Sequence, residues 1–299
     1  MKLSRIKEIG WDVAWLKLKH MLFPKDSQVV MLSSTNGAYD YMRKYRYVLD
    51  RVKREETDVS EGYRNKVIWT CWLQGEEQAP LLVQRCLKSL REHCKDYDVR
   101  VIDERNVKEY VTLPDYIEEK YQKGIISRTH YSDLIRLELL DRYGGIWIDS
   151  TFLLTDRLPK YVTDSELFCY QRSPAGHIIA ANPLITAVQG HPVIRDVKLL
   201  LFEYWKHENR LVSYSIFHLF FTLCYEENAR DKALIDKMPY VPTELMNVML
   251  YKLGSVYTPE LWKHITSLTP LHKLTYRFER YGVDVQREGT IYDYIVNQL

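Results

Sequence analysis

The chain has 299 residues, of which 46% are hydrophobic and 27% charged, and its formal net charge is +2. These values are ordinary for a globular protein and allow one large α/β domain with a core of normal size. The small net charge argues against nucleic acid as the main partner, because such proteins usually concentrate a basic surplus. The five cysteines include no C-x-x-C pair, which is typical of free thiols in a reducing cytoplasm.

Residues 1–60 are expected to form a helical N-terminal extension. Residues 3–23 mix apolar side chains with Lys, Arg and His, and this pattern predicts a basic amphipathic helix that ends before Pro24. Two interpretations stay open. The helix lies on the inner face of a membrane, as a peripheral contact through residues 1–25, or it packs on the main domain. A second helical stretch is expected over residues 39–56. No apolar run reaches the roughly eighteen residues that span a bilayer, and no secretory signal is recognisable, so the expected location is cytoplasmic.

Residues 61–299 are expected to form the main domain, beginning with alternating strands and helices. β-branched and aromatic runs predict strands, and apolar residues at helical spacing predict helices. The expected elements are a strand over 66–72, a helix over 80–94, a strand over 97–102, helices around Val107 and over 114–122, a helix over 128–143, and a strand over 146–148. This alternation predicts a mostly parallel sheet with helices on both faces.

The second half of the chain gives weaker signals. Strands are expected over 167–170 and 178–181, and helices over 192–207 and 214–225. Residues 226–299 contain short elements separated by Pro and Gly residues, and no repeat is recognisable.

The residues that indicate chemistry lie between Ser132 and Thr151. Asp133 and Arg136 are three positions apart, so they share one helix face. A Gly-Gly turn then leads into a strand that presents Asp149 at its carboxyl end, where open α/β sheets bind ligands. Carboxylates suit sugar hydroxyls, and an arginine or a divalent metal suits phosphates. The alternative is a surface ion pair of little energetic worth and a carboxylate that only caps a turn.

The same segment resembles a known family. A Ser-Asp-x-x-Arg helix, Tyr-Gly-Gly, an aromatic residue and an Asp-x-Asp position resemble the sugar-binding DXD region of glycosyltransferase family 32. The related bacterial capsular polysaccharide synthesis proteins are more similar still. The upstream strand with its Trp-x-x-Gly loop is also similar, so the resemblance covers residues 64–160. The matching positions are Ser132, Asp133, Arg136, Tyr143, Gly144, Gly145, Trp147 and Asp149.

The resemblance implies a GT-A type fold, with a Rossmann-like, mostly parallel sheet flanked by helices. It assigns Asp133 and Arg136 to the donor sugar and its phosphates, and Asp149 to the ribose, the sugar or the metal shell. It assigns Trp72 to the nucleotide base, although an ordinary core tryptophan is an equal alternative. Further residues expected in the donor site are Gly75, Tyr143, Gly145, Trp147 and Thr151.

The chain departs from the family pattern at Thr151, which stands where the second Asp of the motif is expected. The resemblance implies Mn²⁺ or Mg²⁺, but a hydroxyl is a poorer ligand than a carboxylate for a hard cation. The metal would be held by Asp149 with the diphosphate, water and a distal residue, for which His218 and His272 are the candidates. The alternatives are weak dependence on metal and loss of activity.

The predicted function is that of a retaining glycosyltransferase. It would move a hexose from a nucleotide sugar, expected to be UDP-linked, to a surface polysaccharide or a lipid-linked glycan precursor. Phosphate-binding and esterase motifs such as G-x-x-x-x-G-K-[ST] and G-x-S-x-G are missing from the sequence. The rival hypothesis is a catalytically inactive GT-A-fold protein that binds glycan or nucleotide, or that acts as a scaffold of a polysaccharide-assembly complex.

Overall fold

The computed structural model describes residues 28–52, 65–171 and 177–299. Its centre is a five-stranded sheet in the order β2-β1-β3-β6-β5. β1 pairs in parallel with both β2 and β3, whereas β6 pairs antiparallel with β3 and β5. Four of these five strands therefore share one direction, and the expected mostly parallel sheet is confirmed. The strands are β1 (Val67–Cys71), β2 (Asp98–Ile102), β3 (Gly145–Ile148), β5 (Leu167–Gln171) and β6 (Ala180–Ala187).

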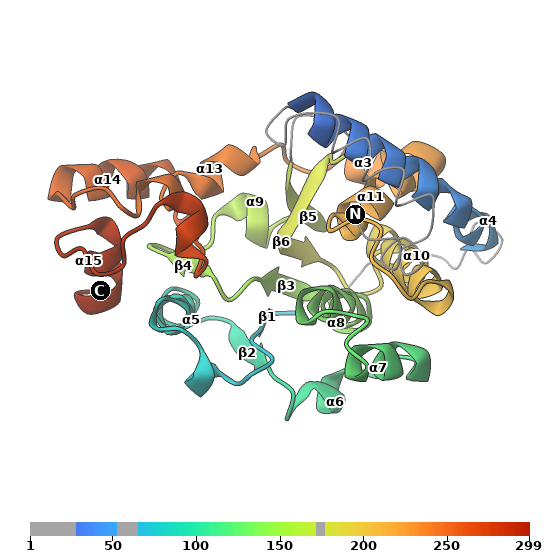
Figure 1. Cartoon of the computed structure of the whole chain (residues 1–299), viewed down its shortest axis with the longest axis horizontal. Helices are drawn as coiled ribbons and strands as arrows, with labels where there is room; N and C mark the ends of the chain where they lie inside the picture. Colours follow the sequence, from blue (N-terminus) through green and yellow to red (C-terminus); the bar gives the residue numbers. More distant parts are fainter. Residues whose placement is uncertain (1–27, 53–64, 172–176) are drawn as a thin grey trace, which may run out of the picture.

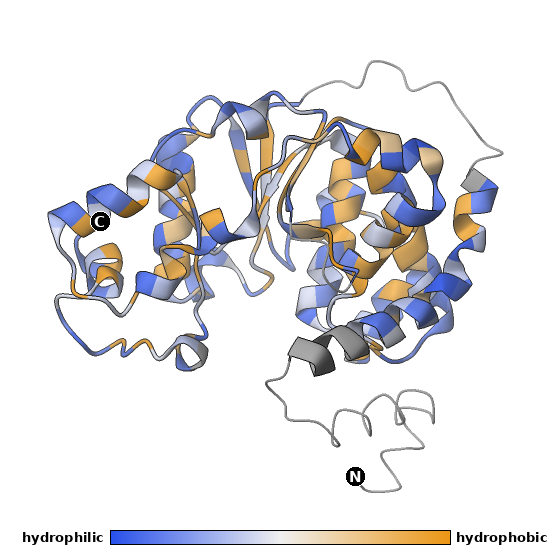
Figure 2. Ribbon diagram, turned by 90° about the horizontal axis from the view of Figure 1, so that it is seen from above, coloured by the Kyte–Doolittle hydropathy of each residue, from blue (hydrophilic) through white to orange (hydrophobic). Residues whose placement is uncertain are grey.

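Helices cover both faces of the sheet (Figures 1 and 2). The larger ones are α5 (Leu81–His93), α7 (Asp115–Gln122), α8 (Arg128–Tyr143), α10 (Pro192–His207), α11 (Ile216–Glu227) and α14 (Pro259–Leu268). Shorter ones are α6 (Val107–Tyr110), α9 (Lys160–Thr163), α12 (Ala229–Ile235), α13 (Thr243–Asn247), α15 (Ile291–Asn297) and the 3₁₀ turns η2 (Glu76–Gln78), η3 (Leu250–Lys252) and η4 (Phe278–Tyr281). The expected mixed α/β fold is thus confirmed.

Side chains that alternate along β1 and β3 enter two different clusters of the core, one on each face of the sheet. On β1, Val67 and Trp69 face α8, α10 and α11, whereas Ile68 faces α5 and α9 on the opposite side. The same alternation separates Trp147 from Ile148 on β3. Because successive strand residues point to opposite faces, continuous apolar strands are what a sheet covered on both faces requires. Figure 2 shows the apolar residues gathered where helices and sheet meet.

The N-terminal helices pack on the helical layer beside α10 and α11. They are α3 (Gln28–Met42), η1 (Arg43–Tyr45) and α4 (Tyr47–Val52), so the helix expected from residue 39 is interrupted and its first part begins earlier. The Tyr45 hydroxyl donates to Glu208 at 2.9 Å, and the Lys44 ammonium lies 2.6 Å from the same carboxylate. The amphipathic helix predicted over 3–23 and the domain boundary at residue 60 lie outside the described residues. Within the described ranges, no helix has the length and apolar character needed to cross a membrane.

Strand β6 begins later and is longer than the sequence predicts. A strand was expected over 178–181, but β6 runs from Ala180 to Ala187 and includes Pro183. Its register with β5 shifts between Cys169 and Tyr170. A proline cannot donate to a sheet ladder, so it is tolerated in a strand mainly at such an irregularity. The predicted strand ended before Pro183 because a proline is normally excluded from a strand. The bulge that accommodates this proline is set by pairing with β5, which the sequence pattern does not show.

The C-terminal part returns to the site through a two-stranded ribbon. β7 (Leu271–Lys273) pairs antiparallel with β4 (Phe152–Leu154), which follows the end of β3. The Leu274 amide donates to the Thr151 carbonyl at 2.8 Å and extends this pairing. The ribbon therefore brings residues after position 270 to the carboxyl end of β3.

Candidate active site

A pocket of about 920 Å³ opens at the carboxyl ends of β1 and β3. It lies between α8 and α11 on one side and the segment that follows β7 on the other. Among the described residues that line it, four are lysine or arginine and one is acidic, which leaves a surplus of three positive charges. The four are Arg128, Arg136, Lys273 and Arg277, called the cationic group below. The pocket therefore favours an anionic ligand, although the whole chain is almost neutral.

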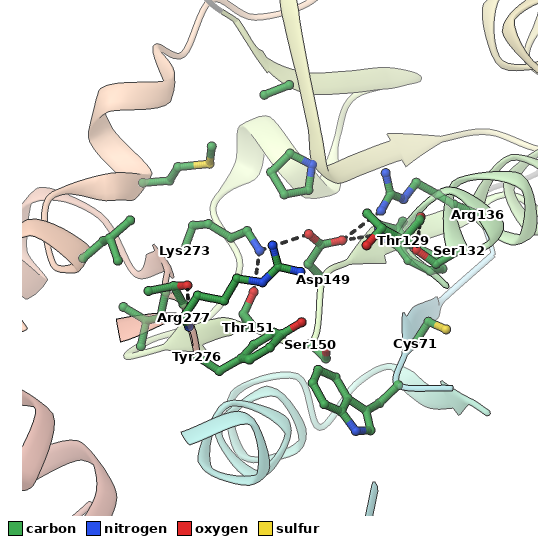
Figure 3. A pocket seen from close by; sticks show the side chains of 18 of the residues that line it. Cys71, Thr129, Ser132, Arg136, Asp149, Ser150, Thr151, Lys273, Tyr276 and Arg277 are labelled. Carbon is green, nitrogen blue, oxygen red and sulfur yellow. Dashed lines mark hydrogen bonds and ion pairs between the residues drawn. The ribbon is translucent and has the colours of Figure 1, made fainter. Parts of the chain in front are cut away.

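Asp149 lies at the centre of the pocket, between Arg136 and Lys273 (Figure 3). Its Oδ1 accepts hydrogen bonds from Arg136 Nη2 at 3.0 Å and from Trp147 Nε1 at 2.9 Å. Its Oδ2 lies 3.0 Å from Lys273 Nζ. Burial alone would raise the pKa of this carboxyl. The charges of Lys273 and Arg136 outweigh burial and hold the pKa below its usual value, so Asp149 is a carboxylate at neutral pH.

Arg136 is fixed by three neighbours. Its Nη1 donates to Asp133 Oδ1 at 2.9 Å, and its guanidinium lies 4.6 Å from the centre of the Trp147 ring. The Arg136 side chain is 4% exposed and that of Asp133 is 9% exposed. The i,i+3 pair is thus buried and not a surface ion pair. A buried guanidinium held by two carboxylates and an indole has one orientation.

Asp133 lies behind Arg136 and does not line the pocket. The Asn182 side-chain amide donates to Asp133 Oδ1 at 2.9 Å, the oxygen that also receives Arg136. Burial raises the pKa of Asp133 despite the charge of Arg136. Asp133 therefore acts on the pocket through Arg136, whose guanidinium it orients. Its direct contact with a donor sugar, implied by the family resemblance, stays a prediction.

His272 on β7, predicted as a metal ligand, does not line the pocket, whereas its neighbour Lys273, which was not predicted, does. His272 is fully buried and places Nε2 3.1 Å from the Thr155 hydroxyl. Burial lowers its pKa to about 4. Lys273 instead reaches Asp149 and Thr151, because neighbouring strand residues point to opposite sides. A predicted strand over this segment would have identified one of the two as the pocket residue.

Four other predicted site residues line the pocket: Trp72, Trp147, Thr151 and the candidate metal ligand His218. Trp72 follows β1 and meets the Tyr276 ring edge-on, with ring centres 5.3 Å apart. Its indole N–H is buried and has no hydrogen-bond partner in the described part of the chain. His218 lies on α11, and Thr151 is 6% exposed. These positions allow contact with a ligand, and the individual roles stay predictions.

Gly75, Tyr143 and Gly145 do not line the pocket. Gly145 has φ of 103°, and a Cβ there would lie 2.6 Å from the Val67 carbonyl oxygen, so only glycine fits at the start of β3. The Tyr143 hydroxyl donates to the Tyr110 carbonyl at 3.1 Å. The motif residues of the Tyr-Gly-Gly turn therefore support the site by shaping the chain next to it.

The fold and the pocket define a mixed α/β protein with a cationic pocket at the carboxyl ends of its strands. Residues 25–295 match the capsular polysaccharide synthesis protein family, and the chain belongs to this family. The family expected from the segment between Ser132 and Thr151 is thereby confirmed.

Individual relatives are glycosyltransferases. The chain is 30% identical to the O-glycosyltransferase braB of Annulohypoxylon truncatum over 156 residues, which cover 44% of this chain and 35% of that protein. It is 33% identical to the glycosyltransferase afumC of Aspergillus fumigatus over 96 residues, which cover 29% and 25%. The matches thus span about a quarter to a third of the length of these curated relatives. Among solved structures, the PaToxG glycosyltransferase gives a TM-score of 0.40 at 13% identity and covers 89% of this chain and 93% of that one.

Proposed function

We propose that the protein is a retaining glycosyltransferase that moves a hexose from a nucleotide sugar, UDP-linked, to a glycan. The observation that carries this proposal is the pocket at the strand ends, which the cationic group lines together with Asp149, the one acidic side chain among the described lining residues. A nucleotide sugar presents two phosphates for the cations and sugar hydroxyls for the carboxylate. The pocket volume of about 920 Å³ is within the usual range for small-molecule sites.

In the proposed complex, Asp149 accepts a hydrogen bond from a donor-sugar hydroxyl and Arg136 meets the diphosphate. Both side chains are already held by their neighbours, so binding costs little reorganisation. Trp72 lies at the β1 end of the pocket, where its ring is available to the base. Membership of the family supports this donor class.

Exposed tyrosines at the pocket support a saccharide acceptor. Tyr214 is 66% and Tyr251 69% exposed, and both line the pocket. The rings of Tyr251 and Tyr281 have centres 6.2 Å apart. An exposed tyrosine offers an apolar ring face with a hydroxyl at its end, and a sugar ring likewise combines apolar C–H faces with hydroxyls. We propose that the acceptor is a surface polysaccharide or its lipid-linked precursor and that it binds along these rings.

The charge pattern supports a front-face route to retention. Asp149 is the one carboxylate among the described lining residues, and its two oxygens are engaged by Arg136, Trp147 and Lys273. A double displacement needs a free carboxylate nucleophile. In the front-face route the acceptor hydroxyl attacks from the side on which the diphosphate leaves. The hydroxyl proton passes to the departing phosphate oxygen, and positioning and charge stabilisation supply the rate.

A second candidate is a catalytically inactive glycan- or nucleotide-binding protein of a polysaccharide-assembly complex. Thr151 favours it, because the second carboxylate of the motif is missing. The two candidates differ in turnover, since an active transferase releases a nucleoside diphosphate from its donor.

Release of nucleoside diphosphate from a panel of nucleotide sugars tests the proposal, with a glycan acceptor and with water alone. We expect turnover of one UDP-sugar, and we expect Asp149→Asn to lower it about 100- to 1,000-fold. The matched control is Asp236→Asn, an exposed carboxylate after α12, which should leave the rate unchanged. Binding of a nucleotide sugar without any turnover would favour the inactive protein.

A further inference from the structure

The contacts of Asp149 and Thr151 point to a lysine in the role that a divalent cation was expected to fill. We propose that Lys273 supplies the positive charge that compensates the donor diphosphate, so that the site works without Mn²⁺ or Mg²⁺. This inference rests on the proposed function, since it concerns the same diphosphate. Three observations support it: the side chains that contact Asp149, the position of Lys273, and the hydroxyl of Thr151.

The available ligands do not fit a hard divalent cation. At a phosphate site such an ion is usually held by one or two carboxylates together with the substrate phosphates and water. Asp149 is the sole carboxylate among the described residues that line the pocket, and Lys273 already lies 3.0 Å from its Oδ2. In the described ranges no group of three or more His, Cys, Asp and Glu could hold a metal ion. A cation at Asp149 would displace Lys273 and lie close to the guanidinium of Arg136, so like charges oppose it.

The position of Lys273 is fixed by strand pairing. It pairs with Phe152 in the β4–β7 ribbon, next to Thr151 in the chain. The side chain is 23% exposed and extends into the pocket, where Figure 3 shows it beside Asp149 and Thr151. The pairing of β4 with β7 therefore holds the Lys273 ammonium next to the residues that follow β3.

The ammonium keeps a donor for a ligand. A lysine has three N–H groups. Asp149 Oδ2 and the Thr151 hydroxyl oxygen are its two acceptors in the described structure. The third N–H is available to a phosphate oxygen that enters the pocket. Two fixed acceptors thus orient the ammonium, and Arg277 adds a second positive charge from the same segment.

Thr151 and Lys273 act as a matched pair. An aspartate at position 151 would add a second carboxylate to the ammonium and lower the surplus positive charge of the pocket. The threonine hydroxyl accepts a hydrogen bond from Lys273 without neutralising it. The departure from the Asp-x-Asp pattern therefore keeps the charge of Lys273 for the ligand.

In the transfer step, the bond between the anomeric carbon and the diphosphate oxygen breaks, and its electron pair stays on that oxygen. The acceptor oxygen forms the new bond to the anomeric carbon, and its proton passes to the departing diphosphate. Lys273 keeps its own protons throughout. It stabilises the negative charge that develops on the leaving group, which is the task a metal ion has in other transferases.

Titration calorimetry with UDP, GDP, ADP and dTDP tests the inference, in EDTA and again with Mn²⁺. The proteins are the wild type, Lys273→Met, Lys273→Arg and the control Lys263→Met, an exposed lysine on α14. We expect the wild type to bind one diphosphate equally well in both buffers. Lys273→Met should weaken binding in EDTA about tenfold or more, as loss of a charged hydrogen bond implies. Lys273→Arg should keep most of the affinity, and the control all of it.

Two results would overturn this inference and leave the proposed function intact. One is a wild type that binds a nucleoside diphosphate only when Mn²⁺ is added. The other is Lys273→Met that binds as tightly as the wild type in EDTA. Thermal unfolding of each variant checks that it is folded, and the wild-type comparison does not depend on any variant. If no diphosphate binds the folded wild type in either buffer, the proposed function fails and this inference fails with it.

Discussion

The two walls of the pocket are built in different ways. The first wall is a continuous segment from α8 to the end of β3, in which Arg136 is 4% exposed and held by two carboxylates. The second wall comes from β7 and the residues after it, and Lys273 lies 122 positions from its partner Thr151. Lys273 is 23% exposed and keeps a donor for a ligand. We therefore expect the first wall to contribute to both folding and binding, and the second to contribute to binding with less effect on stability.

The strongest test of this contrast is Arg136→Met. The variant leaves Asp133 and Asp149 without their shared partner, and breaking a buried ion pair in this way costs about 3–5 kcal/mol. We expect the free energy of unfolding to fall by that amount and diphosphate binding to be lost. Denaturant unfolding measures the first effect and calorimetry the second.

The control for Arg136 is Arg157→Met, which removes an exposed arginine after β4. Its unfolding free energy should stay within about 0.5 kcal/mol of the wild type. Lys273→Met should resemble this control in stability while it differs in binding. If Lys273→Met lost as much stability as Arg136→Met, the contrast between the two walls would be wrong.

The next test separates the two neighbours on β7. The pKa of His272 is lowered to about 4 by burial, so the folded state resists its protonation while the unfolded state gains a proton near pH 6.5. The unfolded state thus binds more protons, and stability must fall as the pH falls from about 6.5 to about 4. The loss from this residue is on the order of 3 kcal/mol.

Denaturant unfolding at several pH values measures this loss. His272→Gln should make the unfolding free energy less dependent on pH in that range, although His191, whose pKa is also lowered to about 4, keeps part of the dependence. The control His264→Gln changes an exposed histidine of α14 and should leave the slope as in the wild type. An unchanged slope in His272→Gln would mean that His272 is accessible to protons and not sealed behind the ribbon.

The smallest expected effect concerns the acceptor. Tyr251→Ala removes an exposed ring from the pocket and should raise the KM for a glycan acceptor about two- to tenfold, as loss of one aromatic contact implies. Donor hydrolysis in water should not change. Tyr240→Ala, an equally exposed ring outside the pocket, is the control. A change in donor hydrolysis would place Tyr251 in the donor site instead.

The first wall could be predicted from sequence because its geometry is local. α8 runs from Arg128 to Tyr143 as expected, since helical spacing and the Gly-Gly end are visible in the chain itself. The spacing of Asp133 and Arg136 on one face and the strand that ends at Asp149 follow from the same segment.

The second wall could not be predicted, because it depends on pairing across the chain. β7 has three residues, too few for a clear periodicity, and its partner β4 is equally short. Without that register, residue type alone points to His272, because histidine is the commonest metal ligand, and nothing in the sequence points to Lys273. The same limit applies to β6, whose bulge at Pro183 is set by β5.

The most direct test of the central claim is calorimetric titration of the wild type and of Asp149→Asn with a panel of nucleotide sugars. We predict that one UDP-sugar binds the wild type and that its binding is lost in Asp149→Asn. Binding of no nucleotide sugar by the folded wild type, or equal binding by the variant, would contradict a donor site built around Asp149.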